Sequence, residues 1–331
     1  MSIVINTSNI QIGSYVLCET PTGIYFSGSA RALCFQSAPP MAGAIAGFTA
    51  GGFGPPYYDT IDKFPFATDA GATGAGSLSG TRGDLAGQSS TVAGYTTGGA
   101  TPTASAVIDR FPFATSSTAS NIGSIYLARS YMSGQSSYTN GYSSNGNPIP
   151  APNSYIDRFP FATNSSSTLV GTSTSGRWGS AGQSSSINGY SSGGVAFPGA
   201  ATSVIDKFPF STDAGATSVG NLLDIRSYAG GTGQSSSTHG YVTSGQTPAA
   251  GGNTNCIEKF TFVSDNNSSG VGTLTRCVNN TAGQSSTLNG YTSAGQPPSA
   301  GIDKFPFSTD SSSSNIGNLT VARFLPAGQQ D

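Results

Sequence analysis

A six-residue segment, I-D-[KR]-F-P-F, returns along this chain at nearly constant intervals and constrains its fold more than any other feature. Its six copies, one of them written IEKFTF, begin at Ile61, Ile108, Ile156, Ile205, Ile257 and Ile302. A G-[FY] segment, as in GYTTGG, and a GQSS segment recur with the same step and in a fixed order. Steps of 45 to 52 residues are typical of a repeat architecture in which each copy is one structural unit.

Each unit contains four candidate strands: AGQSS, GYTTGG, VIDRFPF, and a segment that ends on a closing arginine, as in SIYLAR. With 46 glycines and only 8% charged residues, helix formers are scarce, whereas short runs of β-branched and aromatic residues lie between turn residues. Aromatic residues at fixed positions argue against disorder, which glycine and serine richness also permits. Six units of four strands predict an all-β fold, a six-bladed β-propeller of four-stranded antiparallel blades.

The repeat defines the predicted domains, a propeller over residues 41–331 and a short β-rich arm or cap over residues 1–40. In the arm, SYVLCETPTGIYFSG predicts two strands around the turn PTG. This segment is expected either to cover the propeller or to dock to another subunit, which would make a homo-oligomer. The tail FLPAGQQD resembles the opening of a seventh unit, so Leu325 to Gln330 are expected to approach Met41 to Gly52.

The order of the motifs resembles the kelch repeat over roughly residues 40–331. The resemblance is carried by a strand that ends in paired glycines, an aromatic strand after a variable loop, and an L-x-x-A-R segment. It implies the propeller fold. The particular IDKFPF, GQSS and GY motifs also resemble those of repeat proteins encoded by marine bacteriophages. This second resemblance implies a virion component.

Strand geometry explains the hexamer as a packing element. Side chains alternate between the two faces of a strand, so Asp62, Phe64 and Phe66 share one face, while the isoleucine, the cation and the proline share the other. We therefore expect two phenylalanines per unit to fill the space between blades.

The closing arginine lies twenty residues after the acid of the hexamer, or eighteen in the fifth unit. We expect each acid to form a partly buried ion pair with an arginine, most simply the arginine of its own unit. Such a pair would form in a hairpin that sets Phe66 opposite Leu78. The predicted structural ion-pair residues are Asp62, Arg82, Asp109, Arg129, Asp157, Arg177, Asp206, Arg226, Glu258, Arg276, Asp303 and Arg323.

These positions account for nearly all the positive charge. Of thirteen basic residues, six belong to the hexamers and six close the units, which leaves Arg31. With a net charge of −2, a nucleic-acid partner is not expected. The sequence contains no apolar run for membrane insertion and no leader pattern, so the expected location is the virion, after synthesis in the host cytoplasm, or otherwise the cytoplasm.

No catalytic, metal-binding or cofactor-binding residue is predicted, and the chain is not expected to be an enzyme. The one histidine, His239, falls where an exposed turn is expected, and no His or Cys cluster has metal-ligand spacing. The GQSS segments are expected to form polar strands around a central channel. Asp69 and Asp84 have no recurring partner. Cys256 and Cys277 fall out of register and are expected to be free thiols, while Cys18 and Cys34 lie in the N-terminal segment.

Function is expected in the variable loops that follow the glycine pairs, because loops on a rigid scaffold acquire partners. The candidate binding face comprises Pro55, Pro56, Tyr57, Tyr58, Pro148, Tyr155, Phe197, Pro198, Pro297 and Pro298. The alternative is that these prolines only stiffen turns. The loops at the opposite end, around Asp69, Asp213, Asp265 and Asp310, are expected to be solvated.

The expected function is that of a non-catalytic structural or recognition protein, a bacteriophage virion component such as a fibre, tail or head decoration. Its partners would be other virion proteins or a host surface protein or glycan. The alternative is a stand-alone kelch propeller that binds a glycan or protein. An enzyme on a propeller scaffold ranks last, because the fold alone does not define function.

Overall fold

The computed structural model describes residues 43–147, 153–229, 233–247 and 252–331, together with the backbone of four N-terminal strands. The chain divides into two compact units, Met1–Pro39 and Pro40–Asp331. The first unit holds one antiparallel sheet of four consecutive strands, β1 (Ile3–Ile5), β2 (Asn9–Ile12), β3 (Tyr15–Thr20) and β4 (Gly23–Ser27). The pairing of β3 with β4 confirms the two strands predicted around PTG.

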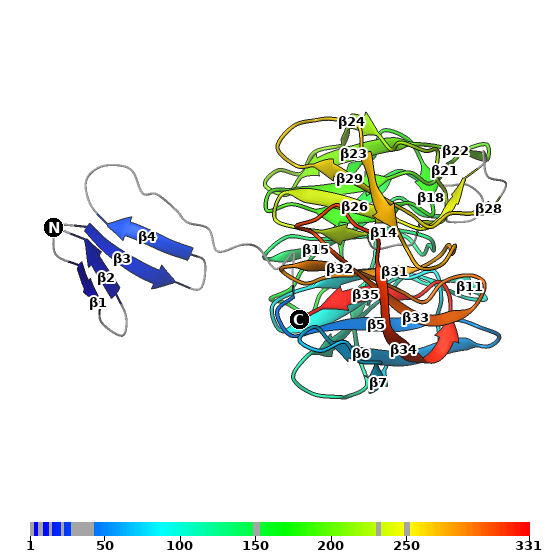
Figure 1. Ribbon diagram of the computed structural model, residues 1–331, viewed down its shortest axis with the longest axis horizontal. Helices are drawn as coiled ribbons and strands as arrows, with labels where there is room; N and C mark the ends of the chain where they lie inside the picture. The colour runs from blue at the N-terminus through cyan, green and yellow to red at the C-terminus, as the bar shows by residue number, and fades with distance from the viewer. Residues whose placement is uncertain are drawn as a thin grey trace. The chain divides into compact units, whose positions relative to one another are not determined.

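Antiparallel sheets of four strands make up the second unit, and its described residues contain no helix (Figure 1). In each sheet the strand order is the same. The GQ segment forms the first strand, the G-[FY] segment the second, the hexamer the third, and a short polar segment the fourth. The fold is therefore all-β and propeller-like, as the repeat predicts.

We number these sheets 1 to 6 by the order of their hexamers. Sheet 1 consists of β35 (Ala327–Gln330), β5 (Ala46–Phe53), β6 (Tyr57–Pro65) and β7 (Thr73–Ser77). Sheet 2 consists of β8 (Ala86–Ser89), β9 (Ala93–Thr97), β12 (Val107–Pro112) and β13 (Ser120–Ser124). Sheets 3 and 4 consist of β14 (Ser133–Ser136), β15 (Asn140–Ser144), β16 (Tyr155–Pro160) and β17 (Thr168–Thr172), and of β19 (Ala181–Ser184), β20 (Asn188–Ser192), β23 (Val204–Pro209) and β24 (Thr217–Asn221).

Sheets 5 and 6 consist of β25 (Gln234–Ser235), β26 (His239–Thr243), β29 (Cys256–Thr261) and β30 (Ser269–Thr273), and of β31 (Ala282–Ser285), β32 (Asn289–Ser293), β33 (Ser299–Pro306) and β34 (Ser314–Arg323). Short strands beside the sheets are β10 (Ala100–Thr101), β11 (Thr103–Ala104), β18 (Arg177–Trp178), β21 (Val195–Ala196), β22 (Ala200–Ala201), β27 (Gln246–Thr247) and β28 (Gly252–Asn253).

The C-terminal tail supplies the first strand of sheet 1. Strand β35 pairs with β5, with Ala327 opposite Ala50 and Gln330 opposite Gly47, and Figure 1 shows this red strand beside the blue one. The prediction that the tail approaches the first repeat is confirmed for these residues. Met41, at the start of the predicted contact, lies outside the described residues.

The predicted register between the hexamer and the closing arginine is wrong. A bulge between Ile61 and Asp62 shifts the pairing, so that Asp62 lies opposite Gly74. Strand β7 then ends at Ser77, before Leu78 and well before Arg82. The same bulge recurs at the equivalent position of the other five sheets. Only β34, in sheet 6, continues as far as its arginine.

The two phenylalanines of each hexamer pack between neighbouring sheets, as predicted. Tyr241 of sheet 5 stacks on Phe307 of sheet 6 with ring centroids 4.8 Å apart and contacts Phe305 at 5.5 Å. Such aromatic pairs contribute about 0.5 to 1.5 kcal/mol each beyond their buried area. The equivalent clusters are Phe48 with Phe111 and Phe113, Tyr95 with Phe159 and Phe161, Tyr142 with Phe208 and Phe210, Tyr190 with Phe260 and Phe262, and Tyr291 with Phe64 and Phe66.

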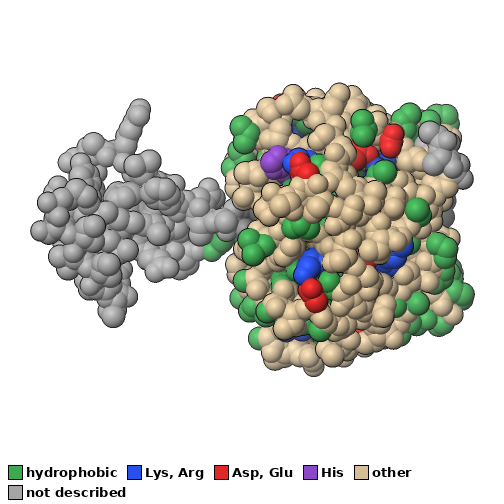
Figure 2. All heavy atoms as spheres, in the orientation of Figure 1, with side chains coloured by type: hydrophobic (Ala, Val, Ile, Leu, Met, Phe, Trp, Pro, Cys, Tyr) green, Lys and Arg blue, Asp and Glu red, His purple; other side chains and the backbone are tan. Residues whose placement is uncertain are grey.

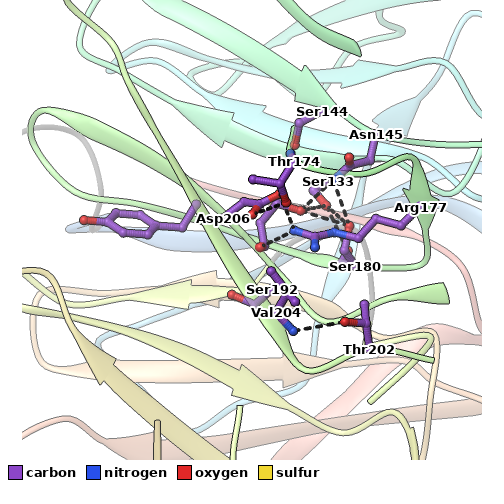
Figure 3. A network of polar contacts seen from close by, with 12 residues as sticks. Ser133, Ser144, Asn145, Thr174, Arg177, Ser180, Ser192, Thr202, Val204 and Asp206 are labelled. Atoms are coloured by element: carbon purple, nitrogen blue, oxygen red, sulfur yellow. Dashed lines mark hydrogen bonds and ion pairs between the residues drawn. The ribbon is translucent and has the colours of Figure 1, made fainter. Parts of the chain in front are cut away.

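The closing arginine reaches the acid of the next sheet, not that of its own unit. Arg177 Nη2 lies 3.1 Å from Asp206 Oδ2, and both side chains are fully buried (Figure 3). The same carboxylate accepts the Thr174 backbone N–H at 3.1 Å and the Thr174 hydroxyl at 2.7 Å. The acid of one sheet therefore holds the whole closing segment of the preceding unit in place.

All twelve predicted residues take part in ion pairs of this kind. The pairs are Arg82 with Asp109, Arg129 with Asp157, Arg177 with Asp206, Arg226 with Glu258, Arg276 with Asp303, and Arg323 with Asp62. Burial lowers the pKa of Arg177, and the charge of Asp206 opposes that effect. The own-unit pairing is wrong. The fourth strands of sheets 1 to 5 end before their arginines, and β34 sets Arg323 opposite Ser299, not opposite the hexamer acid Asp303.

The GQSS segment joins the first strands of neighbouring sheets. Gln135 Nε2 donates to the carbonyl oxygen of Tyr190 in the next sheet at 2.9 Å, and the Ser136 N–H donates to the hydroxyl of Ser184 at 3.0 Å. The last serine, Ser137, accepts the N–H of Asn140 at 3.0 Å and so closes the turn into the second strand. The glutamine and both serines of the motif therefore each make a hydrogen bond within or between sheets.

The glutamine contact recurs in every sheet. The donor and acceptor residues are Gln88 and Tyr142, Gln135 and Tyr190, Gln183 and Tyr241, Gln234 and Tyr291, Gln284 and Phe48, and Gln329 and Tyr95. The cavity that the first strands enclose has a volume of about 20 Å³, room for about one water molecule. The GQSS segments thus line a shared polar space, as predicted. This space is narrow, because neighbouring first strands approach closely at their glycines.

This close packing predicts the effect of two glycine substitutions. A Cβ at Gly134 would collide with the carbonyl oxygen of Gly87, whereas a Cβ at Gly74 would meet nothing within 4 Å. We expect Gly134→Ala to lower the free energy of unfolding by about 3 kcal/mol, since overpacking forces the backbone to move. Gly74→Ala should change it by less than about 1 kcal/mol. Denaturant titration measures both, and equal effects would contradict close contact between the first strands.

Candidate binding face

The loops that join the second to the third strands, together with the residues where one unit passes to the next, form one end of the sheets, which we call the loop face. The predicted binding residues lie here. Phe197 is 71% exposed. The described prolines of the set, Pro55, Pro56, Pro198, Pro297 and Pro298, are also exposed. Pro148 lies outside the described residues.

The tyrosines predicted for this face are half-buried. Tyr57 packs against Phe53 with ring centroids 4.7 Å apart, and the Tyr58 hydroxyl donates to the carbonyl oxygen of Gly54 at 3.2 Å. Tyr155 contacts Tyr126 edge to face at 5.8 Å. These rings therefore support the loops as well as presenting part of their surface, and Phe197 is the most exposed aromatic of the predicted set.

The acidic loops at the opposite end are not merely solvated. Each acid bonds the hexamer cation of the preceding sheet, as Asp265 does with Lys207 at 2.6 Å. The other pairs are Arg158 with Asp213, Lys259 with Asp310, and Lys304 with Asp69. The acids are about half exposed, so each pair contributes only about 0 to 1 kcal/mol. Figure 2 shows such blue and red side chains as small neighbouring spots on a mostly uncharged surface.

That opposite end also carries exposed aliphatic residues that sequence reasoning missed. They precede the second strands, are 59 to 71% exposed, and are Ile45, Val92, Ile187 and Leu288. The last three lie in the turns that join first to second strands. The described chain enters beside these turns, because the Gly43 N–H donates to the Ser285 carbonyl oxygen at 2.7 Å. We call this end the turn face.

Six residues mark the junctions between units on the loop face. Each has a left-handed backbone with φ between +53° and +67°, and they are Asp84, Tyr131, Gly179, Tyr228, Asn280 and Leu325. All but Tyr228 lie two residues before a first strand. Their backbone groups bond one another in sequence. Tyr131 N–H donates to Asp84 at 3.0 Å, and Asp84 N–H donates to Leu325 at 2.9 Å. Only between Gly179 and Tyr228 does a neighbour, Ala229, supply the N–H.

Asp84 is the chemically unusual member of this set. Its side chain is buried, with 8% exposure, and it has no ion pair among those of the described residues. Tyr131 donates a hydrogen bond to the carboxylate, but Oδ1 has no hydrogen-bond partner. The carboxyl group lines a cavity of about 10 Å³ with Leu85 and Met132.

Tyr131 and Tyr57 lie near this carboxylate, and Tyr228 packs on the Tyr131 ring. Tyr131 and Tyr228 lie edge to face with ring centroids 6.0 Å apart. Burial raises the pKa of Tyr57, and the charge of Asp84 raises it further by a smaller amount. Burial raises the pKa of Asp84 to about 7, opposed only in part by the hydrogen bond from Tyr131. We call Asp84, Tyr57, Tyr131 and Tyr228 the Asp84 cluster.

Sequence reasoning missed this cluster because Asp84 occurs in one unit only. The available signal was its place in the repeat, two residues after the closing arginine. The same place holds Tyr131, Gly179, Tyr228 and Leu325 in four other units. A position that holds glycine in one unit and larger side chains of different kinds in the others indicates a shared backbone conformation with variable chemistry.

The remaining reactive side chains gather at no site. His239 is the first residue of β26 and not part of an exposed turn. It bonds the Thr238 hydroxyl at 2.8 Å, and burial lowers its pKa. Cys256 and Cys277 are free, while the side chains of Cys18 and Cys34 lie outside the described part. Within the described ranges, no three His, Cys, Asp or Glu side chains are placed to hold a metal ion.

Compared with models of protein families and with curated proteins, the chain matches none of them. In the part of the chain that the structure describes, no helix is long and apolar enough to cross a lipid bilayer.

The burial of Asp84 predicts a pH dependence of stability. Between the ordinary pKa of 3.8 and the folded value of about 7, the unfolded carboxyl is ionised while the folded one keeps its proton. Stability therefore falls as pH rises through this window. Asp84→Asn removes the effect, so relative to wild type it should gain on the order of 2 to 4 kcal/mol between about pH 4 and pH 8.

Thermal and denaturant unfolding of both proteins at the two pH values measures this gain. Asp310→Asn, which removes an exposed carboxylate bonded to Lys259, is the matched control and should show no comparable gain. If Asp84→Asn instead loses stability equally at both pH values, the carboxylate is stabilised in its charged form and the account of its burial is wrong.

Proposed function

We propose that this chain is a non-catalytic recognition protein built on a six-bladed, kelch-like β-propeller, and that the loop face binds its partner. One observation carries the proposal. The polar groups that repeat along the chain, the hexamer acid, the closing arginine and the five GQSS segments, are bonded between sheets. The groups that differ between units are concentrated in the loops, where Phe197 and the prolines are exposed.

Contacts between successive sheets support the closed propeller. The same glutamine bond and the same ion pair that join sheet 3 to sheet 4 also join sheet 6 to sheet 1, through Gln284 with Phe48 and Arg323 with Asp62. The pairing of β35 with β5 completes sheet 1 with both ends of the repeat region. A six-bladed ring satisfies all these contacts with one geometry per unit.

The chemistry of the described side chains supports a role without catalysis. Asp84 has a raised pKa that would suit a general acid or base. Its hydrogen-bonded neighbour is a tyrosine, and the one histidine of the chain, in sheet 5, bonds a threonine. The serines of the GQSS segments are buried and bonded to neighbouring strands, as Ser136 and Ser184 are. Recognition needs only the exposed loops.

The setting we propose is a bacteriophage virion, on the strength of the sequence resemblance alone. In this arrangement the turn face, where the chain enters at Gly43, points toward the anchoring assembly, and residues 1–40 contribute to the attachment. The loop face then points outward to a host surface protein or glycan. Stoichiometric copy number of the chain in purified particles supports this setting, whereas absence from particles favours a stand-alone binding propeller.

Two surface substitutions test the role of the loop face. Phe197→Ser removes its most exposed aromatic residue, and Val263→Ser is a matched control, since Val263 is 88% exposed in a loop between third and fourth strands at the opposite end. A single aromatic contact at a protein interface is worth more than about 1 kcal/mol. We therefore expect Phe197→Ser to lower host attachment of particles about tenfold, with unchanged copy number.

Attachment is measured as the fraction of particles bound to host cells, and copy number by quantitative mass spectrometry. Val263→Ser should leave both unchanged. The reverse result, loss with Val263→Ser and none with Phe197→Ser, would assign the contact to the other end of the propeller and overturn the proposal.

A further inference from the structure

We propose that the Asp84 cluster binds a primary ammonium group, the tip of a lysine side chain on a protein partner. This inference names the partner chemistry for the loop face, so it rests on the proposed function for its biological meaning. Its test does not, because the binding of a small ammonium ion is measured on the isolated protein.

The first support is an unused acceptor in an enclosed place. Asp84 is buried, its Oδ1 has no hydrogen-bond partner, and it lines a cavity of about 10 Å³. A buried carboxylate without a hydrogen-bonded positive partner is costly to ionise. A cation that enters the cavity would satisfy Oδ1 and remove that cost, so charge complementarity favours a positively charged ligand.

The second support is the size and lining of the cavity, which exclude larger organic cations. Besides Asp84 its lining includes apolar side chains such as Leu85, Met132 and Pro326, together with the polar residues Tyr131, Asn280 and Thr281. The volume matches about one water molecule, which is also about the size of an ammonium group. A guanidinium is planar and wider, and a sugar amine carries a ring directly behind the nitrogen. A lysine presents its charge on a thin aliphatic stem that matches the apolar walls.

The third support is a group of aromatic rings beside the carboxylate, of which Tyr131 lines the cavity. The Tyr131 and Tyr228 rings are 6.0 Å apart, and Tyr57 lies near enough for the charge of Asp84 to raise its pKa. Tyrosine rings attract ammonium ions through their negative faces. The nearest cation in the sequence, Arg82, is bonded to Asp109 at 2.8 Å. The titratable groups that line the cavity are thus Asp84 and Tyr131; Tyr57 is near enough to respond to the charge of Asp84, and Tyr228 packs on Tyr131.

The test uses n-butylammonium chloride as a stand-in for the lysine side chain, with saturation-transfer NMR to measure its dissociation constant. We expect saturable millimolar binding near pH 8, weakened about tenfold or more near pH 5.5, where the carboxyl is protonated. Asp84→Asn should weaken binding about tenfold at the higher pH. Asp213→Asn, which removes an exposed carboxylate bonded to Arg158, should leave it unchanged.

Three further probes make the result specific. At equal ionic strength, n-butanol, n-butylguanidinium and potassium chloride should each fail to displace n-butylammonium. Displacement by potassium, by butanol or by the guanidinium would overturn the inference in favour of a metal-ion, apolar or unselective site, as would unchanged binding to Asp84→Asn. If Phe197→Ser impairs attachment but n-butylammonium does not bind, the proposed function stands and this inference fails.

Discussion

The buried ion pair between each closing arginine and the acid of the next sheet is the interaction on which the rest of the fold depends. Arg177 bonds Asp206 with both side chains fully buried, and Asp206 also fixes the backbone that leads to this arginine. An isolated buried charge is costly, so neither partner is tolerated without its neighbour in the next unit. The pair therefore ties the position of every sheet to that of the sheet before it.

The residues that hold the sheets together differ from the residues proposed to bind a partner. Aromatic clusters such as Tyr241 with Phe307 and the contacts of the GQSS segments stabilise the interfaces in the same way in every unit. Side chains that differ between units are not needed to stabilise these interfaces. Phe197 is exposed on the loop face, and Asp84 takes a place that other units fill with tyrosine, glycine, asparagine or leucine. A single unit can thus acquire a binding group without disturbing the scaffold.

Much of this architecture was predictable because the repeat shows which residues share a structural role. Motif order and strand periodicity predict the all-β sheets, the packing of the hexamer phenylalanines and the pairing of the tail with the first repeat. The partner of Arg82 did not follow, because a bulge at Ile61 alters a register that sequence spacing presents as regular. Asp84 was missed for a different reason: its burial results from contacts between units, and no other unit repeats it.

The most direct test of this account is a double-mutant cycle on the free energy of unfolding, with Arg177→Met, Arg226→Met and Asp206→Asn singly and in pairs. Residues that share a buried ion pair couple, whereas distant residues add within about 0.5 kcal/mol. The account predicts a coupling of about 2 kcal/mol or more between Arg177 and Asp206, and near-additivity between Arg226 and Asp206. Strong coupling of Asp206 to Arg226, the arginine of its own unit, would contradict it.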